Sequence, residues 1–168
     1  ITKSRLALSK KADNRFEVSW EVCNKGGGIY TVVKSKELRM LEVYQDKYFQ
    51  IGPYFRENAA TEFREEIASQ EFKEIFSKLK NEGIICHYGK QIRDPVNTIL
   101  IDFKEFLTNK NKIKTKLWED FKVDSLTAGN DFDEPVTWAT AVGKLLELIY
   151  EDNKKEKIVA QFHEWLSG

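Results

Sequence analysis

The glycine-rich turn formed by Lys25, Gly26, Gly27 and Gly28 has the residue types needed to hold a phosphate group. It lies between a strand-like segment and a segment expected to be helical, so backbone N–H groups at the helix N-terminus would face a ligand. Lys25 would add a positive charge. Thr31 stands where the pattern G-x-G-x-x-G has its third glycine, and no G-K-[ST] sequence completes a P-loop. The turn therefore predicts either a phosphate site or a tight strand-to-helix turn without a ligand.

A second candidate is His163, which directly follows the last strand-like segment. A histidine at the carboxyl end of such a strand can donate to a sugar hydroxyl or move a proton, although a purely structural role stays open. We interpret His87 as structural and Cys23 as a small buried side chain without a base nearby. We interpret Asp131 and Asp133 as acids that cap a helix.

Metal and aromatic chemistry receive less support from the residue pattern. Two cysteines and two histidines are too few, and too widely spaced, to form a zinc site. The tryptophans could stack on sugar rings or bases, but we expect core packing for most of them. They are Trp20, Trp118, Trp138 and Trp165.

Composition is typical of one globular domain without nucleic-acid or membrane affinity. The 168 residues include 27 Lys+Arg and 27 Asp+Glu, so the formal net charge is zero, and 41% are hydrophobic. The lysine-rich run at residues 110–116 is interpreted as a solvated loop or helix face. No apolar stretch approaches the length of about 18 residues that a membrane span needs, and no secretory leader is evident. We expect a reduced, cytoplasmic protein, and the absence of an initial Met suggests a piece of a longer chain.

The elements that must position these residues alternate between strands and helices. We expect a flexible arm over residues 1–15 and one domain over residues 16–168. Alternation between strands and helices predicts an α/β fold with a Rossmann-like, doubly wound, mostly parallel sheet. Strands are predicted at residues 16–20, 48–52, 84–88, 98–103 and 157–162, and helices after the glycine turn and at residues 69–81, 117–123 and 135–150.

Four segments resemble the glycogen synthases of the animal and fungal type, in order and spacing. They are residues 16–32 (FEVSWEVCNKGGGIYTV), 48–53 (YFQIGP), 129–138 (GNDFDEPVTW) and 159–168 (VAQFHEWLSG). The resemblance implies a retaining glycosyltransferase of the two-domain GT-B fold, of which this chain would be part of the N-terminal domain. It also implies transfer of glucose from UDP-glucose or ADP-glucose to glycogen or another α-1,4-glucan, with no metal ion or other cofactor.

The same resemblance assigns roles to individual residues. Lys25, Gly27 and Gly28 match the family's donor-binding glycine loop, and His163 matches a catalytic histidine near the donor glucose. Gly26 departs from the family, which has Val or another larger residue there, so we expect a looser loop. The C-terminal half would supply most nucleotide contacts, and we therefore expect the isolated chain to be catalytically incomplete. The sequence does not decide whether the protein forms oligomers.

Two other functions remain to be separated from the synthase. One is a non-catalytic α/β module on the same scaffold that binds glucan or a partner protein. The other is a dinucleotide-dependent oxidoreductase, which the incomplete glycine pattern disfavours.

Overall fold

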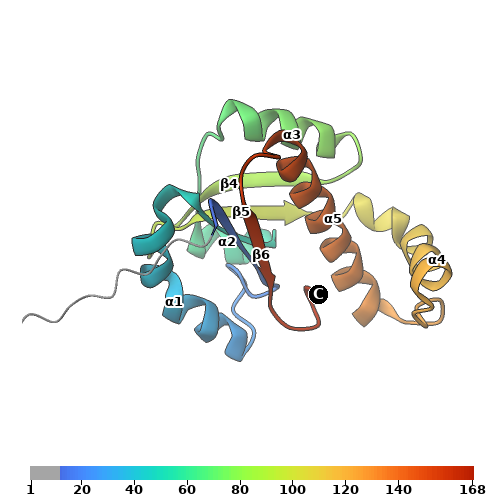
Figure 1. The fold of residues 1–168 in the computed structure, drawn as a ribbon. Coiled ribbons are helices and arrows are strands. Elements are labelled where there is room, and N and C mark those ends of the chain that lie inside the picture. The colour runs from blue at the N-terminus through green and yellow to red at the C-terminus, as the bar shows by residue number, and fades with distance from the viewer. Residues whose placement is uncertain (1–11) are drawn as a thin grey trace, which may run out of the picture.

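The fold is built on a single sheet, and the computed structural model describes residues 12–168. Its strands are β1 (Asn14–Val18), β2 (Tyr48–Pro53), β3 (Phe63–Glu65), β4 (Ile85–Gln91), β5 (Asn97–Asp102) and β6 (Ile158–Phe162). They lie in the order β3-β4-β5-β2-β1-β6. Figure 1 shows how the chain is arranged around this sheet. β1, β2, β5 and β6 are parallel, whereas β4 is antiparallel to both of its neighbours.

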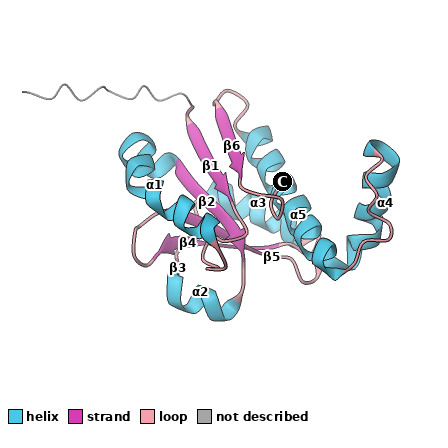
Figure 2. Ribbon diagram, turned by 90° about the horizontal axis from the view of Figure 1, so that it is seen from below, coloured by secondary structure: helices cyan, strands magenta, loops and turns pink. Residues whose placement is uncertain are grey.

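Helices cover both faces of this sheet (Figure 2). They are α1 (Gly28–Tyr44), α2 (Arg56–Glu62), α3 (Gln70–Lys80), α4 (Lys110–Phe121) and α5 (Asn130–Asp152), with short 3₁₀ turns at Gln45–Lys47 and Phe106–Asn109. α3 and α5 pack together on one face, and α4 packs against α5 rather than against the sheet. Within residues 12–168, no helix is both long and apolar enough to cross a membrane.

The two faces of the central strands have opposite chemistry because neighbouring side chains of a strand point in opposite directions. Phe16 and Val18 of β1 join the apolar core that α3 and α5 cover. Glu17, between them, is fully buried on the face covered by α1. In β2, Gln50 is likewise buried and donates to Glu37 of α1 across 3.1 Å. The sheet therefore has an apolar core on one side and a buried polar layer on the other.

The structure confirms the predicted α/β, Rossmann-like, mostly parallel sheet. Each predicted strand is present, but β1 begins at Asn14 and ends at Val18 rather than spanning residues 16–20. Asn14 and Arg15 thus belong to the sheet, while residues 1–11 of the predicted arm lie outside the described residues. Ser69 caps α3 as predicted, accepting from the Phe72 N–H across 3.3 Å. The sequence analysis did not anticipate α2 or β3.

Two interpretations of charged segments are correct only in part. Lys112 and Lys116 lie on an exposed helix face, and Asp131 and Asp133 fall in the first turn of α5, where the helix dipole favours acids. The lysine-rich run forms most of α4, and Lys114 is buried rather than solvated, with its Nζ 2.9 Å from Asp133 Oδ1. Asp133 does not cap a helix end: its other oxygen lies 2.8 Å from Lys110 Nζ. The long helix begins at Asn130, one turn before Pro135. The carboxylate of Asp133 thus links α5 to α4 through ion pairs with Lys110 and Lys114.

Candidate functional site

The candidate site lies where the order of the parallel strands reverses. β1 pairs with β2 on one side and with β6 on the other, and in such sheets ligands bind beyond the carboxyl ends of the strands at this switch point. The glycine turn follows the end of β1, and His163 follows the end of β6. The fold thus brings both sequence-predicted motifs to one edge of the sheet.

The turn after β1 is fixed by contacts within the protein. Asn24 Nδ2 donates to the Trp20 carbonyl across 3.0 Å, and Asn58 Nδ2 donates to Asn24 Oδ1 across 2.7 Å. Cys23 is buried as expected, and burial raises the pKa of its thiol to about 12. A thiol with this pKa stays protonated at neutral pH and is a poor nucleophile.

The N-terminus of α1 already holds a carboxylate of the protein itself. Glu21 Oε2 accepts hydrogen bonds from the N–H groups of Gly27 and Tyr30, each across 2.8 Å. These are backbone donors that a helix N-terminus leaves unpaired, and its dipole favours an anion there. A Cβ on Gly27 would lie 3.0 Å from Glu21 Oε1, whereas one on Gly28 would meet nothing within 4 Å.

The predicted donor-binding residues therefore differ in what they offer. Gly27 is engaged by Glu21, while Gly28 and the side chain of Lys25 are exposed. Lys25 Nζ lies 5.9 Å from the centre of the Tyr30 ring and forms no ion pair within residues 12–168. Of the three predicted donor-binding residues, Gly28 and Lys25 are thus the ones left open to a ligand.

His163 is held between β1 and β6. Its backbone N–H donates to the Val18 carbonyl, and its Nε2 lies 3.0 Å from Glu17 Oε1, with the side chain 8% exposed. An ionised carboxylate can only accept, so Nε2 carries the proton. Nδ1 is then the ring atom of the neutral imidazole that can accept a hydrogen bond.

Glu17 organises the buried polar layer beside His163. It contacts the Tyr48 hydroxyl and the Lys36 ammonium, and it bonds to His163. Burial alone would raise the pKa of Glu17, but hydrogen bonds from Lys36, Tyr48 and His163 hold it below its ordinary value. The carboxylate therefore remains ionised at neutral pH and fixes the histidine ring.

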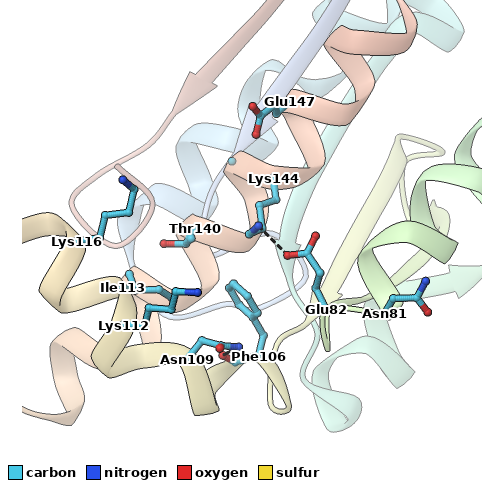
Figure 3. A pocket seen from close by; sticks show the side chains of 11 residues that line it. Asn81, Glu82, Phe106, Asn109, Lys112, Ile113, Lys116, Thr140, Lys144 and Glu147 are labelled. Atoms are coloured by element: carbon cyan, nitrogen blue, oxygen red, sulfur yellow. Dashed lines mark hydrogen bonds and ion pairs between the residues drawn. The ribbon is translucent and has the colours of Figure 1, made fainter. Parts of the chain in front are cut away.

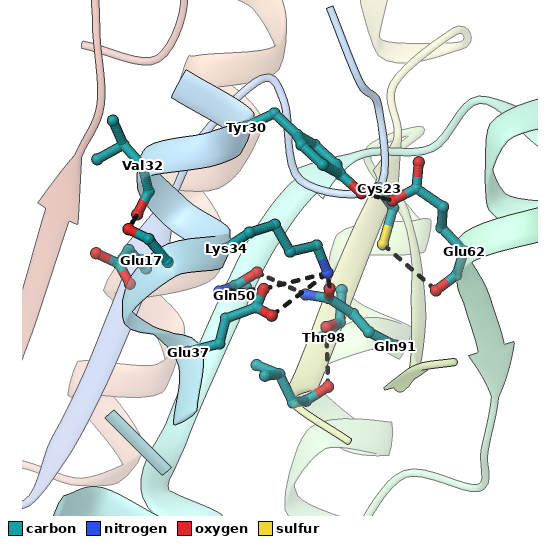
Figure 4. Close-up of polar contacts among 12 residues, drawn as sticks. Glu17, Cys23, Tyr30, Val32, Lys34, Glu37, Gln50, Glu62, Gln91 and Thr98 are labelled. Atoms are coloured by element: carbon teal, nitrogen blue, oxygen red, sulfur yellow. Dashed lines mark hydrogen bonds and ion pairs between the residues drawn. The ribbon is translucent and has the colours of Figure 1, made fainter. Parts of the chain in front are cut away.

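The same layer continues beneath α1 (Figure 4). Gln50 Nε2 lies 3.0 Å from the Tyr48 hydroxyl and 3.1 Å from Glu37 Oε1, and Lys34 Nζ lies 3.3 Å from that same oxygen. Sequence reasoning missed Glu17 and this layer. The available signal was the polar residue between two apolar ones in both central strands, at Glu17 and Gln50.

The remaining candidates have structural or surface positions. His87 stacks on Tyr54 with 3.9 Å between ring centres, and its Nδ1 lies 2.9 Å from Glu65 Oε1, consistent with the structural interpretation. Trp138 is fully buried, as expected for a core residue. Trp165, in contrast, is 63% exposed and Trp118 is partly exposed, so the core packing expected for most tryptophans holds for Trp20 and Trp138 but not for these two.

One cavity is separate from these residues. It has a volume of about 690 Å³ and lies between the end of α3, the turn after β5, α4 and α5 (Figure 3). Phe106 and Ile113 form part of its wall, and Lys144 pairs with Glu82 across 2.7 Å. A second cavity, of about 470 Å³, is lined by Trp20 and Trp165 and therefore adjoins the ends of β1 and β6.

Comparisons with known proteins show which family this chain resembles. The chain is 30% identical over 155 residues to the liver glycogen [starch] synthase of Homo sapiens and 33% identical over 155 residues to the glycogen [starch] synthase of Neurospora crassa. Over 152 residues it is 33% identical to the glycogen [starch] synthase of Dictyostelium discoideum. These matches cover 91%, 91% and 89% of this chain, but only 22%, 22% and 17% of the respective relatives.

The matched region includes the whole candidate site. The family model described as Glycogen synthase matches residues 17–168, from Glu17 through the glycine turn to His163 and beyond. These matches do not favour the non-catalytic module or the oxidoreductase. The chain belongs to the glycogen synthase family.

Proposed function

We propose that the protein containing this chain transfers glucose from a nucleotide-glucose donor, UDP-glucose or ADP-glucose, to the non-reducing end of an α-1,4-glucan. The family match over residues 17–168 carries this proposal, because it spans both motifs at the switch point of the sheet. Retention of configuration at the transferred carbon, and independence from a metal ion, are further parts of the proposal that rest on the resemblance.

Lys25 and Gly28 are proposed to contact the donor. Glucosyl transfer releases a nucleoside diphosphate, so an ammonium group and an exposed backbone N–H beside the leaving group would stabilise the developing charge. Gly27 is proposed to act indirectly, since its N–H is bonded to Glu21. This division of roles refines the expectation that all three residues meet the donor.

His163 is proposed to contact the donor glucose at the reacting centre. Its Nε2–H is engaged by Glu17, which leaves Nδ1 to accept a hydrogen bond from a sugar hydroxyl. A histidine oriented by a buried carboxylate loses little entropy when the transition state forms. Glu17 is accordingly proposed as a positioning residue.

The remaining part of the enzyme is proposed to come from chain beyond these residues. The chain spans about a fifth of the length of its human relative, 22% of it. The decisive experiment measures incorporation of labelled glucose into glycogen, from UDP-glucose and from ADP-glucose, by the 168-residue chain and by the protein extended to the length of its relatives. We expect turnover only by the extended protein. Its failure with both donors would refute the proposed function.

A further inference from the structure

Lys36 is the charged partner that the buried Glu17 receives from α1. Its ammonium group contacts Glu17 Oε1, the same oxygen that lies 3.0 Å from His163 Nε2. The other oxygen of Glu17 accepts from the Tyr48 hydroxyl. The side chain of Glu17 has no exposed surface, whereas that of Lys36 is 29% exposed. One carboxylate oxygen thus joins a lysine of the helix that follows the glycine turn to the histidine that follows β6.

The charges around Glu17 are balanced when His163 is neutral. A buried carboxylate needs a cation beside it, and Lys36 supplies one. Arg15, on the same side of β1 as Glu17, contacts the Gln161 side chain of β6. Burial would raise the pKa of Glu17, and the hydrogen bond from Lys36 contributes most among the contacts that lower it. The histidine can therefore keep one proton, on Nε2, with the lone pair of Nδ1 available.

Loss of this ammonium group would leave a buried negative charge beside the histidine. His163 is the group best placed to restore the balance, because it already bonds to the carboxylate and can take a second proton. A doubly protonated ring donates from both nitrogens, so Nδ1 could no longer accept from a sugar hydroxyl.

We propose that Lys36 is a positioning residue that acts on His163 through Glu17. By balancing the charge of the carboxylate, Lys36 keeps the imidazole neutral and Nδ1 free to accept a hydrogen bond. It also links α1, and with it the glycine turn, to the histidine. The use of Nδ1 in glucosyl transfer rests on the proposed function. The control of the ring by Lys36 rests on the contacts of Glu17.

Lys34 provides a matched control on the same helix. Its side chain is 20% exposed, and its Nζ lies 3.3 Å from Oε1 of the equally buried Glu37 (Figure 4). Lys34→Met and Lys36→Met each remove a cation from a buried carboxylate, so both variants should lose stability. Only Lys36 contacts the carboxylate that bonds to His163.

The first test follows the ring nitrogens of the two histidines of the 168-residue chain by NMR at neutral pH. In the wild type, His163 should show a neutral ring with its proton on Nε2. Lys36→Met should shift these signals toward those of a doubly protonated ring, whereas Lys34→Met should leave them unchanged. Lys36→Arg keeps the positive charge and should resemble the wild type. His87 is the internal control, because it bonds to Glu65 instead.

Glu17→Gln tests whether the effect passes through the carboxylate. In this background Lys36→Met should cause no further change at His163, because no buried charge remains to be balanced. Lys36→Gln replaces Lys36→Met in both comparisons if the methionine variant does not fold. Unmoved His163 signals in the Lys36 variant, an equal effect of Lys34→Met, or a further change in the Glu17→Gln background would overturn the proposal.

This NMR test and the activity test can fail separately. In the extended protein, Lys36→Met should lower kcat by about tenfold, and Lys36→Arg should restore most of it. If the His163 signals respond to Lys36→Met but the extended protein transfers no glucose, the positioning role stands and the proposed function is refuted. If the extended protein transfers glucose but the signals do not respond, the function stands and the positioning role is refuted.

Discussion

Glu21 Oε2 lies 2.8 Å from the backbone nitrogen of Gly27 and accepts its hydrogen bond at the start of α1. Because the same oxygen also accepts from Tyr30, two free donors of the helix are satisfied by one side chain of the preceding turn. A Cβ at position 27 would lie 3.0 Å from Oε1 of this carboxylate, so a larger residue there requires the Glu21 side chain to shift away from these donors.

Substitution of Gly27 should consequently lower the free energy of unfolding more than substitution of Gly28. Gly27→Ala displaces the Glu21 carboxylate and should lower the free energy of unfolding by about 1–2 kcal/mol, the usual cost of losing a helix N-terminal cap. Gly28→Ala meets nothing within 4 Å and adds a better helix former, so it should stabilise by up to about 1 kcal/mol. Urea unfolding of the two variants measures the difference, and equal stabilities would contradict this role of Glu21.

Stability should fall in acid partly through Glu17. Its pKa is lowered in the folded protein, with burial opposed by hydrogen bonds from Lys36, Tyr48 and His163. Ionised Glu17 therefore stabilises the fold fully above its ordinary pKa of 4.5, and this contribution disappears as the pH falls through the lowered value. We expect the stability difference between wild type and Glu17→Gln to be larger at about pH 7 than at about pH 3.

Glu37→Gln is the matched control for this measurement. Burial raises the pKa of Glu37 despite the opposing effect of Lys34. Its ionised form therefore lowers the free energy of unfolding at neutral pH, and this loss disappears as the pH falls and the carboxyl group is protonated. The two variants should therefore show pH dependences of opposite sign in urea unfolding. Parallel curves would show that the buried layer does not hold Glu17 ionised.

Because of the ion pair between α4 and α5, Lys114 should contribute more to the free energy of unfolding than its neighbours in the lysine-rich run. Within residues 12–168, Lys114→Ala leaves the buried carboxylate of Asp133 with Lys110 as its one remaining ammonium partner, and we expect a loss of about 2 kcal/mol in unfolding free energy. Lys112→Ala, on the exposed side of the same helix, should change stability by less than about 0.5 kcal/mol. Similar effects of both substitutions in thermal unfolding would restore the interpretation of the run as solvated.

Local patterns were sufficient to predict every strand except β3, but not the polar layer between the sheet and α1. β2 is identified by the Gly52-Pro53 pair that ends it. The alternation in residues 16–20 identifies β1, because side chains of a strand alternate between faces whatever those faces contact. It cannot tell whether the polar face meets water or a helix. Glu17 therefore resembled a solvated residue, although Lys36 covers it from α1.

The partners of the site residues could not be predicted for a related reason. His163 and Glu17 are 146 positions apart, and only the parallel pairing of β1 with β6 brings them together. The motif identified His163, but nothing local to it indicates a carboxylate. The exposure of Trp165 likewise depends on how the turn after β6 packs against α5, which periodicity does not determine.

A valine at position 26 should tighten donor binding. A Cβ on Gly26 would lie 4.0 Å from its nearest neighbours, the Asn24 carbonyl oxygen and Glu21 Cδ, so a side chain has room. Restricting the backbone before binding reduces the entropy that the donor complex must lose. In the extended protein, Gly26→Val should lower the donor KM by about two- to threefold with the glucan KM unchanged. A donor KM that rises would show that the loop needs its flexibility.

His163 should matter more for turnover than for glucan affinity. Its ring is fixed by Glu17, so a contact from Nδ1 to the donor glucose would be made most strongly when charge develops at the reacting carbon. In the extended protein, His163→Ala should lower kcat by at least about tenfold, while the KM for glucan changes little. His87→Ala is the matched control, because that ring stacks on Tyr54 and contacts Glu65 instead.

Glu17→Gln should lower kcat less than His163→Ala does. It should also alter the pH profile of kcat, since the glutamine amide no longer fixes which nitrogen of His163 carries the proton. Unchanged turnover in His163→Ala would remove this histidine from the reacting centre and leave it a structural link between β1 and β6.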